Sequence, residues 1–232
     1  MILVLAFFGS LIPGIILFLW LRGQKDMRPG YQRFCSRALV SGILSVIGAF
    51  LLSTAFSIIF KPTGVKELDP LLYRFLHMMI LIAFSEELMK FLVMKKAVKG
   101  EEHSWFEYAV FMAITAMGFG LAEAIPYAFE GGAIHMFVRG FTLMHTSYGF
   151  IIGYFYGKTK KTGQKIHGII GFLIAWLLHG LYDFSLSDEF EALNDNLVFI
   201  PFLLTFVSVV MIVVFIRFVR KRRNDPKYTE LV

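Results

Sequence analysis

Seven chemically active residues of this 232-residue sequence stand inside otherwise apolar stretches. They are Glu86, Glu87, Lys90, Glu123, His145, His179 and Asp183. A carboxylate in an apolar pocket can act as a general base toward water, and imidazoles can stabilise an oxyanion or ligate zinc with one position left open for water. These residue types therefore indicate either a hydrolytic site or the relay of a proton- or ion-coupled carrier.

Helical spacing relates these groups to one another. Glu86 and Lys90 are four residues apart, so they share a helix face and can form an ion pair, whereas Glu87 points about 100° away. His179 and Asp183 are also four apart, which lets the carboxylate orient the imidazole or share a ligand with it. A buried ion-pair network that only fixes helix register is the alternative, but it explains five or six such groups on four helices poorly.

The elements that must carry these residues are membrane-spanning helices. The sequence is 57% hydrophobic and 17% charged, whereas soluble domains are about 45–50% apolar and roughly 25% charged. We predict an all-α polytopic bundle with seven spans, at residues 1–21, 37–60, 72–94, 107–129, 137–156, 166–186 and 197–216. The bundle is expected to be a single transmembrane domain (1–232) with a catalytic core at 72–186 and a basic cytoplasmic tail at 217–232.

Composition and charge exclude several other classes of protein. So apolar a chain is neither a soluble enzyme nor a nucleic-acid-binding module, although its net charge is +6. The single cysteine, Cys35, excludes a disulfide framework and a cysteine-ligated zinc site. Most Lys and Arg residues fall in one set of alternating loops, which predicts an N-terminus outside and a C-terminus in the cytoplasm. The basic run Arg217–Arg223 is expected to lie at anionic lipid of the cytoplasmic face.

Small residues indicate which helix faces turn inward. A GxxxGxxxG row over residues 149–157 follows His145, and similar rows of small residues precede Glu123 and His179. Small residues let helices approach closely in lipid, so the polar groups are expected on packing faces. Counted from the predicted span ends, these three groups lie roughly 9–12 Å deep, in the outer half of the bilayer. We therefore expect a site open to the extracytoplasmic side.

Three ordered motifs resemble those of a known family. EExxK at residues 86–90, FxxxE at 119–123 and HxxxD at 179–183, with Arg139 and His145 between the last two, are similar to the motifs of the PrsW family of intramembrane proteases. Type II CAAX prenyl endopeptidases and abortive-infection-type membrane proteins are wider relatives that usually carry Arg, His and Asn at the corresponding places. Lys90, Glu123 and Asp183 favour the PrsW side instead.

The sequence departs from the family pattern at one position, and the resemblance has several implications. Ala124 stands where the family commonly has Asn, which leaves the identity of the substrate open. The resemblance implies a multi-pass, prokaryotic protein of the cell membrane. It also implies an endopeptidase that cuts a single-span membrane protein, similar to an anti-sigma factor, first on its extracytoplasmic side under envelope stress. An inactive membrane scaffold or receptor is a further alternative.

Each residue of the predicted site has an expected role in the chemistry. Glu86 is the leading general base, and Glu87 either shares that role, ligates a metal or pairs with Lys90. Zn²⁺ is the expected ion, and a metal-free glutamate mechanism is the alternative. The expected metal ligands are Glu123, His145, His179 and Asp183. Phe119 is expected to be packing that keeps the site dry.

The other histidines carry less weight in this interpretation. His77 is expected to face away from the site, and His103 and His135 are expected to be solvated loop residues. His167 stands at the start of the sixth predicted span, where we expect it to be interfacial.

Overall fold

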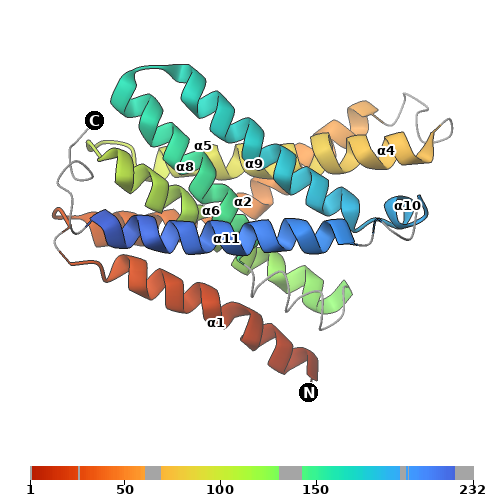
Figure 1. Cartoon of the computed structure of the whole chain (residues 1–232), viewed down its shortest axis with the longest axis horizontal. Helices are drawn as coiled ribbons and strands as arrows, with labels where there is room; N and C mark the ends of the chain where they lie inside the picture. The colour runs from red at the N-terminus through yellow and green to blue at the C-terminus, as the bar shows by residue number, and fades with distance from the viewer. Residues whose placement is uncertain are drawn as a thin grey trace.

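The computed structural model describes residues 2–25, 27–60, 69–130, 143–193, 197 and 199–222, and they form a helical bundle (Figure 1). The helices are α1 (Ile2–Arg22), α2 (Tyr31–Phe60), α4 (Pro70–Leu76), the π-helix η2 (His77–Phe84), α5 (Ser85–Ala97), α6 (Trp105–Glu130), α8 (Met144–Thr162), α9 (Lys165–Ser185), α10 (Asp188–Glu191) and α11 (Phe199–Arg222). Of the helices in these residues, α2, α6, α9 and α11 are long and apolar enough to cross a membrane. The count of seven spans stays a prediction.

Within the described residues the predicted spans coincide with helix, but some bounds differ. α11 runs on to Arg222, through the first residues of the predicted basic tail. α8 begins at Met144 because Leu143 has φ 52°, a left-handed conformation through which an α-helix does not continue. The predicted start of that span at residue 137 lies outside the described residues, and His145 lies in the first turn of α8. His135 and Arg139 lie outside the described residues.

Capping residues explain several helix ends. Asp69 accepts a hydrogen bond from the backbone N–H of Leu72 at 2.9 Å, and Pro70 follows it as the first residue of α4. Ser187 caps the short α10 in the same way. α8 ends at Gly163, whose φ of 73° suits a residue without a side chain. α4 and α10 are joined by an ion pair in which Arg74 Nε lies 2.8 Å from Glu189 Oε2.

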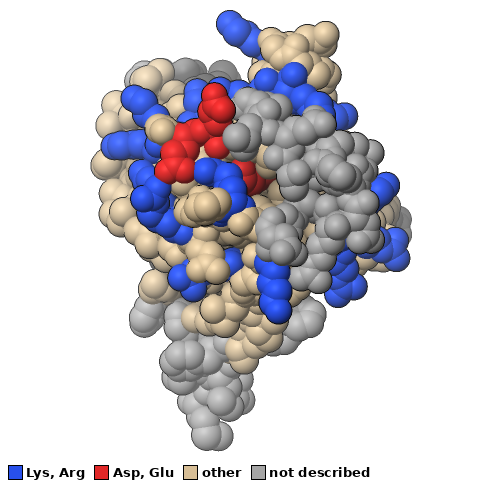
Figure 2. Space-filling view, turned by 90° about the vertical axis from the view of Figure 1, so that its left-hand side faces the viewer, with Lys and Arg blue, Asp and Glu red and all other residues tan. Residues whose placement is uncertain are grey.

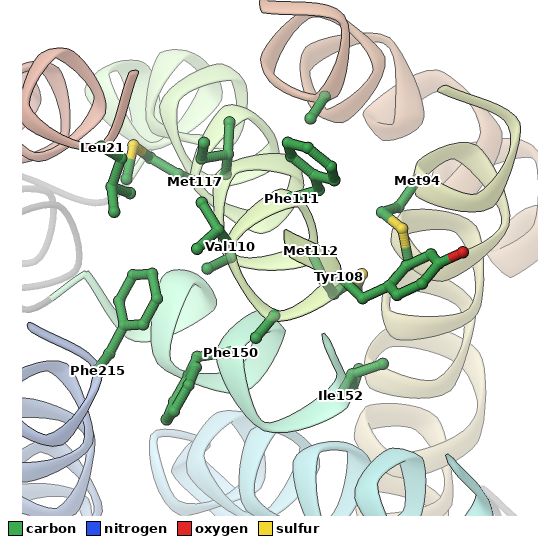
Figure 3. Packing of buried hydrophobic residues seen from close by; sticks show 14 of the residues in the cluster. Leu21, Met94, Tyr108, Val110, Phe111, Met112, Met117, Phe150, Ile152 and Phe215 are labelled. Atoms are coloured by element: carbon green, nitrogen blue, oxygen red, sulfur yellow. The ribbon is translucent and has the colours of Figure 1, made fainter. Parts of the chain in front are cut away.

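α6 is the central helix of the bundle. In the most apolar 18-residue stretch of α6, 72% of the residues are buried inside the protein. The corresponding share is 17% for α2 and 11% for α11. Around it pack side chains of neighbouring helices, among them Leu21 of α1, Met94 of α5, Phe150 of α8 and Phe215 of α11 (Figure 3). The exposed apolar faces of α2 and α11 are the ones expected to meet lipid, because little of them is covered by protein.

The row of glycines on α8 packs against α6, as its spacing predicts. A Cβ atom at Gly149 would lie 2.5 Å from Ala116 Cβ, and one at Gly153 would lie 2.6 Å from the carbonyl oxygen of Tyr108. Neither position has room for a methyl group. On α9, Gly171 meets the ring of Phe155 of α8 in the same way. The small-residue rows therefore mark interhelical contacts.

The basic residues of the loops gather at one end of the bundle. The C-terminal ends of α1, α5, α8 and α11 lie there, at the left of Figure 1, and we name it the loop end. Figure 2 looks onto this end and shows Lys and Arg side chains spread around it, with one group of acidic side chains among them. This arrangement agrees with the charge pattern that predicted the topology, while the orientation itself stays a prediction.

Two acidic residues at the loop end, Glu101 and Glu107, belong to a cluster of four residues. This loop-end cluster consists of Arg28, Glu101, His103 and Glu107. Arg28 donates to Glu107 at 2.9 Å and to Glu101 at 2.7 Å, and its remaining nitrogen contacts Nδ1 of His103. Nε2 of His103 donates to the carbonyl of Val98 at 2.7 Å. The cluster ties the segment between α1 and α2 to the start of α6.

The interpretation of His103 as a solvated loop residue is wrong. Its side chain is fully buried and lies edge-on to the rings of Phe34 and Phe111. Burial lowers the pKa of His103 below its usual value, since the charged form would lose its hydration. The guanidinium of Arg28 acts in the same direction, so the imidazole is held neutral.

Candidate active site

A change of helix type precedes the glutamate pair. η2 is a π-helix of eight residues that passes directly into α5, so that Glu86 and Glu87 lie in the first turn of α5. The indole Nε1 of Trp176 on α9 donates to the carbonyl oxygen of Met79 at 2.6 Å. Widened turns of this kind occur often at functional sites, because they shift the residues that follow relative to a regular helix. The sequence pattern did not predict this π-helix.

Lys90 lies between the two glutamates. Its Nζ is 2.7 Å from Glu87 Oε1 and 3.5 Å from Glu86 Oε2, and it stands 4.2 Å from the ring centre of Phe119. Lys90 and Glu87 are both fully buried. The predicted pair of Glu86 and Lys90 exists, but the shorter contact is to Glu87, three residues away. The ring of Phe119 packs over this ammonium group as a cation–π contact.

His179 joins α9 to this pair of glutamates. Its Nδ1 is 2.8 Å from Glu87 Oε1, and since a carboxylate oxygen accepts, Nδ1 carries the proton. The other ring nitrogen, Nε2, faces Glu86 Oε2 at 3.6 Å and Asp183 Oδ2 at 3.2 Å. The ring of Tyr148 stacks on the imidazole with centroids 5.4 Å apart. The position of His179 is thus fixed from two sides.

His145 joins α8 to α6 at the same place. Its Nε2 is 2.5 Å from Glu123 Oε2, and its Nδ1 is 3.3 Å from Lys90 Nζ. A Cβ atom at Gly120 would lie 3.0 Å from the imidazole, so the glycine gives His145 the room it occupies. The rings of His145 and His179 are 5.1 Å apart.

The structure brings all seven predicted site residues into one cluster, in which every residue except the partly exposed Glu123 is buried. We name it the intramembrane cluster, and it consists of Glu86, Glu87, Lys90, Glu123, His145, His179 and Asp183. Tyr148 was missed by the sequence reasoning, although its place three residues after His145 puts it on the same helix face. The site lies away from the loop end: His145 is in the first turn of α8, and His179 is in the last third of α9.

The donor atoms of the cluster fit a divalent metal ion. Ligand atoms of Glu86, His145 and His179 lie within 4.8 Å of one another. Among the described atoms, Glu86 Oε2 and His179 Nε2 are buried without a hydrogen-bond partner. Two imidazoles and one carboxylate form the ligand set of many catalytic zinc sites, and Glu87 on the second nitrogen of His179 is the usual outer partner.

This set differs from the ligands expected from the sequence. Glu86 belongs to it, and of the four expected ligands it contains His145 and His179. Glu123 and Asp183 each lie beside an imidazole nitrogen instead, at 2.5 Å and 3.2 Å. Helix spacing could not separate these carboxylates, because all of them lie on inward faces.

Comparison with known proteins identifies the family. Residues 32–217 match the family described as PrsW family intramembrane metalloprotease. The chain belongs to this family. It is 28% identical to Protease PrsW of Oceanobacillus iheyensis over 148 residues, which are 61% of this chain and 67% of that protein. It is 26% identical to Protease PrsW of Bacillus subtilis over 188 residues, which are 77% and 81% of the two chains. No solved structure matches.

Membership of the PrsW family confirms the resemblance seen in the three motifs. The matched range contains the whole intramembrane cluster and every helix that contributes to it. A PrsW-family chain with several apolar helices is a multi-pass membrane protein. The polar cluster therefore lies in a helix bundle built for a membrane, where ionisable groups are costly.

Proposed function

We propose that this PrsW-family chain is an endopeptidase that hydrolyses a peptide bond of a membrane-anchored protein at the intramembrane cluster. The observation that carries the proposal is the pair of buried polar atoms with no hydrogen bond, Glu86 Oε2 and His179 Nε2, which lie 3.6 Å apart. A buried network that served stability alone would satisfy such atoms. Each has a charged neighbour but no hydrogen bond, Lys90 Nζ at 3.5 Å from Glu86 Oε2 and Asp183 Oδ2 at 3.2 Å from His179 Nε2, so they can receive water and a substrate carbonyl.

The chain's own residues would divide the work. In the metal-free alternative, Glu86 would take the proton of the attacking water and pass it to the leaving nitrogen. Glu87 would hold Nδ1–H of His179, so that Nε2 stays turned to the reacting atoms. Lys90, 2.7 Å from Glu87 and 3.5 Å from Glu86, would balance the charge of the pair.

His145, His179 and Glu86 are the residues that would hold a divalent ion, for which Zn²⁺ is our proposal. Such an ion, when bound, lowers the pKa of a water molecule and polarises a carbonyl group. The hydrogen bond of His145 to Glu123 would fix the ring that presents the ligand atom.

The proposed substrate is a single-span membrane protein, similar to an anti-sigma factor, cut on its extracytoplasmic side in the cell membrane of a prokaryote. Two observations support cleavage on the extracytoplasmic side. The basic loops define the loop end, which we assign to the cytoplasm with the C-terminus. The site lies toward the opposite ends of α6 and α9, since Glu123 and His179 both come late in their helices. The basic end of α11 would then meet anionic lipid at the cytoplasmic face.

The test compares new protein N-termini in membranes of cells that express the wild type, Glu86→Gln or Glu102→Gln. Glu102 is an exposed glutamate outside the cluster and provides the matched control. We expect cleavage products with extracytoplasmic termini in the wild type and the control, and a reduction of about 10²- to 10⁴-fold in Glu86→Gln. Equal products from all three proteins would overturn the proposal.

A further inference from the structure

A groove runs along the interface of α2 and α5 near the loop end. Its volume is about 590 Å³, which is within the roughly 300–1,000 Å³ of small-molecule sites. Residues on successive turns of both helices line it, among them Arg37, Val40, Leu44, Met89, Val93 and Lys96. None of its lining residues belongs to the intramembrane cluster.

The dimensions of the groove match one leaflet of a bilayer. On α2 it extends from Ser36 to Ser45, which is about 14 Å of helix. The hydrocarbon core is about 30 Å thick, so the groove covers about half of it. Its polarity changes along this length, with Arg37 and Lys96 toward the loop end and Leu44 and Met89 deeper. A phospholipid of one leaflet has the same order of charged headgroup and apolar chain.

The two cations of the groove are available to an anion. Neither Arg37 nor Lys96 forms an ion pair with any residue that the structure describes, and no acidic residue lines the groove. Arg33, one turn before Arg37 on α2, is by contrast engaged by Glu101 at 2.5 Å. The guanidinium of Arg37 lies 5.3 Å from the ring centre of Phe34, which gives it an apolar support.

We propose that the groove between α2 and α5 binds an anionic phospholipid, with the phosphate at Arg37 and Lys96 and an acyl chain along Val40 and Val93. Basic pockets between transmembrane helices are a known form of headgroup site. The deep end of the groove is Met89, the residue before Lys90. A bound lipid would thus extend the contact of α2 with the helix that carries the glutamate pair. The proposal does not depend on proteolysis.

The test titrates the purified full chain in detergent with phosphatidylglycerol and with phosphatidylcholine, with bound lipid counted by native mass spectrometry. Each basic side chain near an anionic headgroup strengthens binding about fivefold, so the wild type should prefer phosphatidylglycerol by about 30-fold. The double variant Arg37→Gln/Lys96→Gln should lose this preference. Lys95→Gln is the matched control, since Lys95 neighbours Lys96 but lies over Phe91 outside the groove.

A second variant tests the apolar part without touching the cations. Val93→Trp fills the groove, so it should weaken binding of phosphatidylglycerol at least tenfold while the protein keeps its melting temperature. Glycerol 3-phosphate, which has the anionic group but no acyl chain, should not compete. An unchanged lipid preference in the double variant, unchanged binding in Val93→Trp, or full competition by glycerol 3-phosphate would each overturn the proposal.

Discussion

Two polar clusters of this protein contain similar kinds of residue and differ in how completely their buried atoms are hydrogen-bonded. The loop-end cluster has one arginine, two glutamates and a histidine, and both nitrogens of His103 have partners. Glu107 accepts from Arg28 and from the backbone N–H of Ser104. In the intramembrane cluster, three described atoms are buried without a hydrogen bond: Glu86 Oε2, Glu87 Oε2 and His179 Nε2.

The difference separates a structural cluster from a chemical one. A saturated network holds segments together, and at the loop end it joins residues far apart in the sequence, such as Arg28 and Glu107. A network with open donor and acceptor positions is unfavourable unless something else fills them. Two of the open atoms of the intramembrane cluster, on Glu86 and His179, face each other at 3.6 Å. We interpret these as the place where a metal ion, water and substrate are held.

The largest effect on stability is expected for Lys90→Met. Removal of this ammonium leaves the carboxylates of Glu86 and Glu87 buried and uncompensated, which costs about 3–5 kcal/mol. Chemical unfolding in detergent measures the loss. Lys95→Met, on an exposed position of the same helix, should change the free energy of unfolding by less than about 0.5 kcal/mol. Equal stability of the two variants would show that Lys90 does not balance the pair.

Glu87→Gln is expected to act next most strongly, and on metal affinity. The glutamine can no longer serve as a charged acceptor for Nδ1–H of His179, so zinc affinity should fall by about 10- to 100-fold. Competition with a chromophoric chelator measures it. Glu101→Gln changes a glutamate of the loop-end cluster and should leave zinc affinity as in the wild type. The same loss in both variants would contradict the assignment of Glu87 as the partner of His179.

Arg28→Gln should weaken the fold without touching the chemistry. It leaves Glu107, of which 2% is exposed, without its charged partner, and we expect a loss of about 1–2 kcal/mol. Proteolytic activity per folded molecule should remain that of the wild type. A loss of activity larger than the loss of folded protein would show that the loop-end cluster takes part in function.

The smallest expected effect is on the pH dependence of stability. Burial lowers the pKa of His103 in the folded protein, with Arg28 acting in the same direction and Glu101 and Glu107 opposing it. Protonation therefore favours the unfolded chain. This contribution to stability is fully present above the pKa of about 6.5 of the unfolded histidine, and it is lost as the pH falls toward the folded value. His103→Gln should show a flatter melting temperature between pH 7 and pH 5, and an unchanged slope would contradict this origin.

The sequence predicts the features that local patterns determine, namely the helices and the polar residues inside them. Apolar length locates the helices, and the cost of ionisable groups in a membrane singles out residues such as Glu86 and His179. Glycine rows then predict that their helices meet. The pattern cannot predict η2, because seven apolar residues after His77 fit a π-helix and an α-helix equally well. It also missed the burial of His103, which depends on Arg28, 75 residues away.

The most direct test of the difference between the clusters is the zinc content of purified full-length protein after loading and removal of free ion, measured by elemental mass spectrometry. We compare the wild type with His179→Gln and with His103→Gln, one histidine from each cluster. We predict about one zinc ion per chain in the wild type and in His103→Gln, and its loss in His179→Gln. Equal zinc in all three proteins, or loss in His103→Gln alone, would contradict the assignment of the open positions to metal binding.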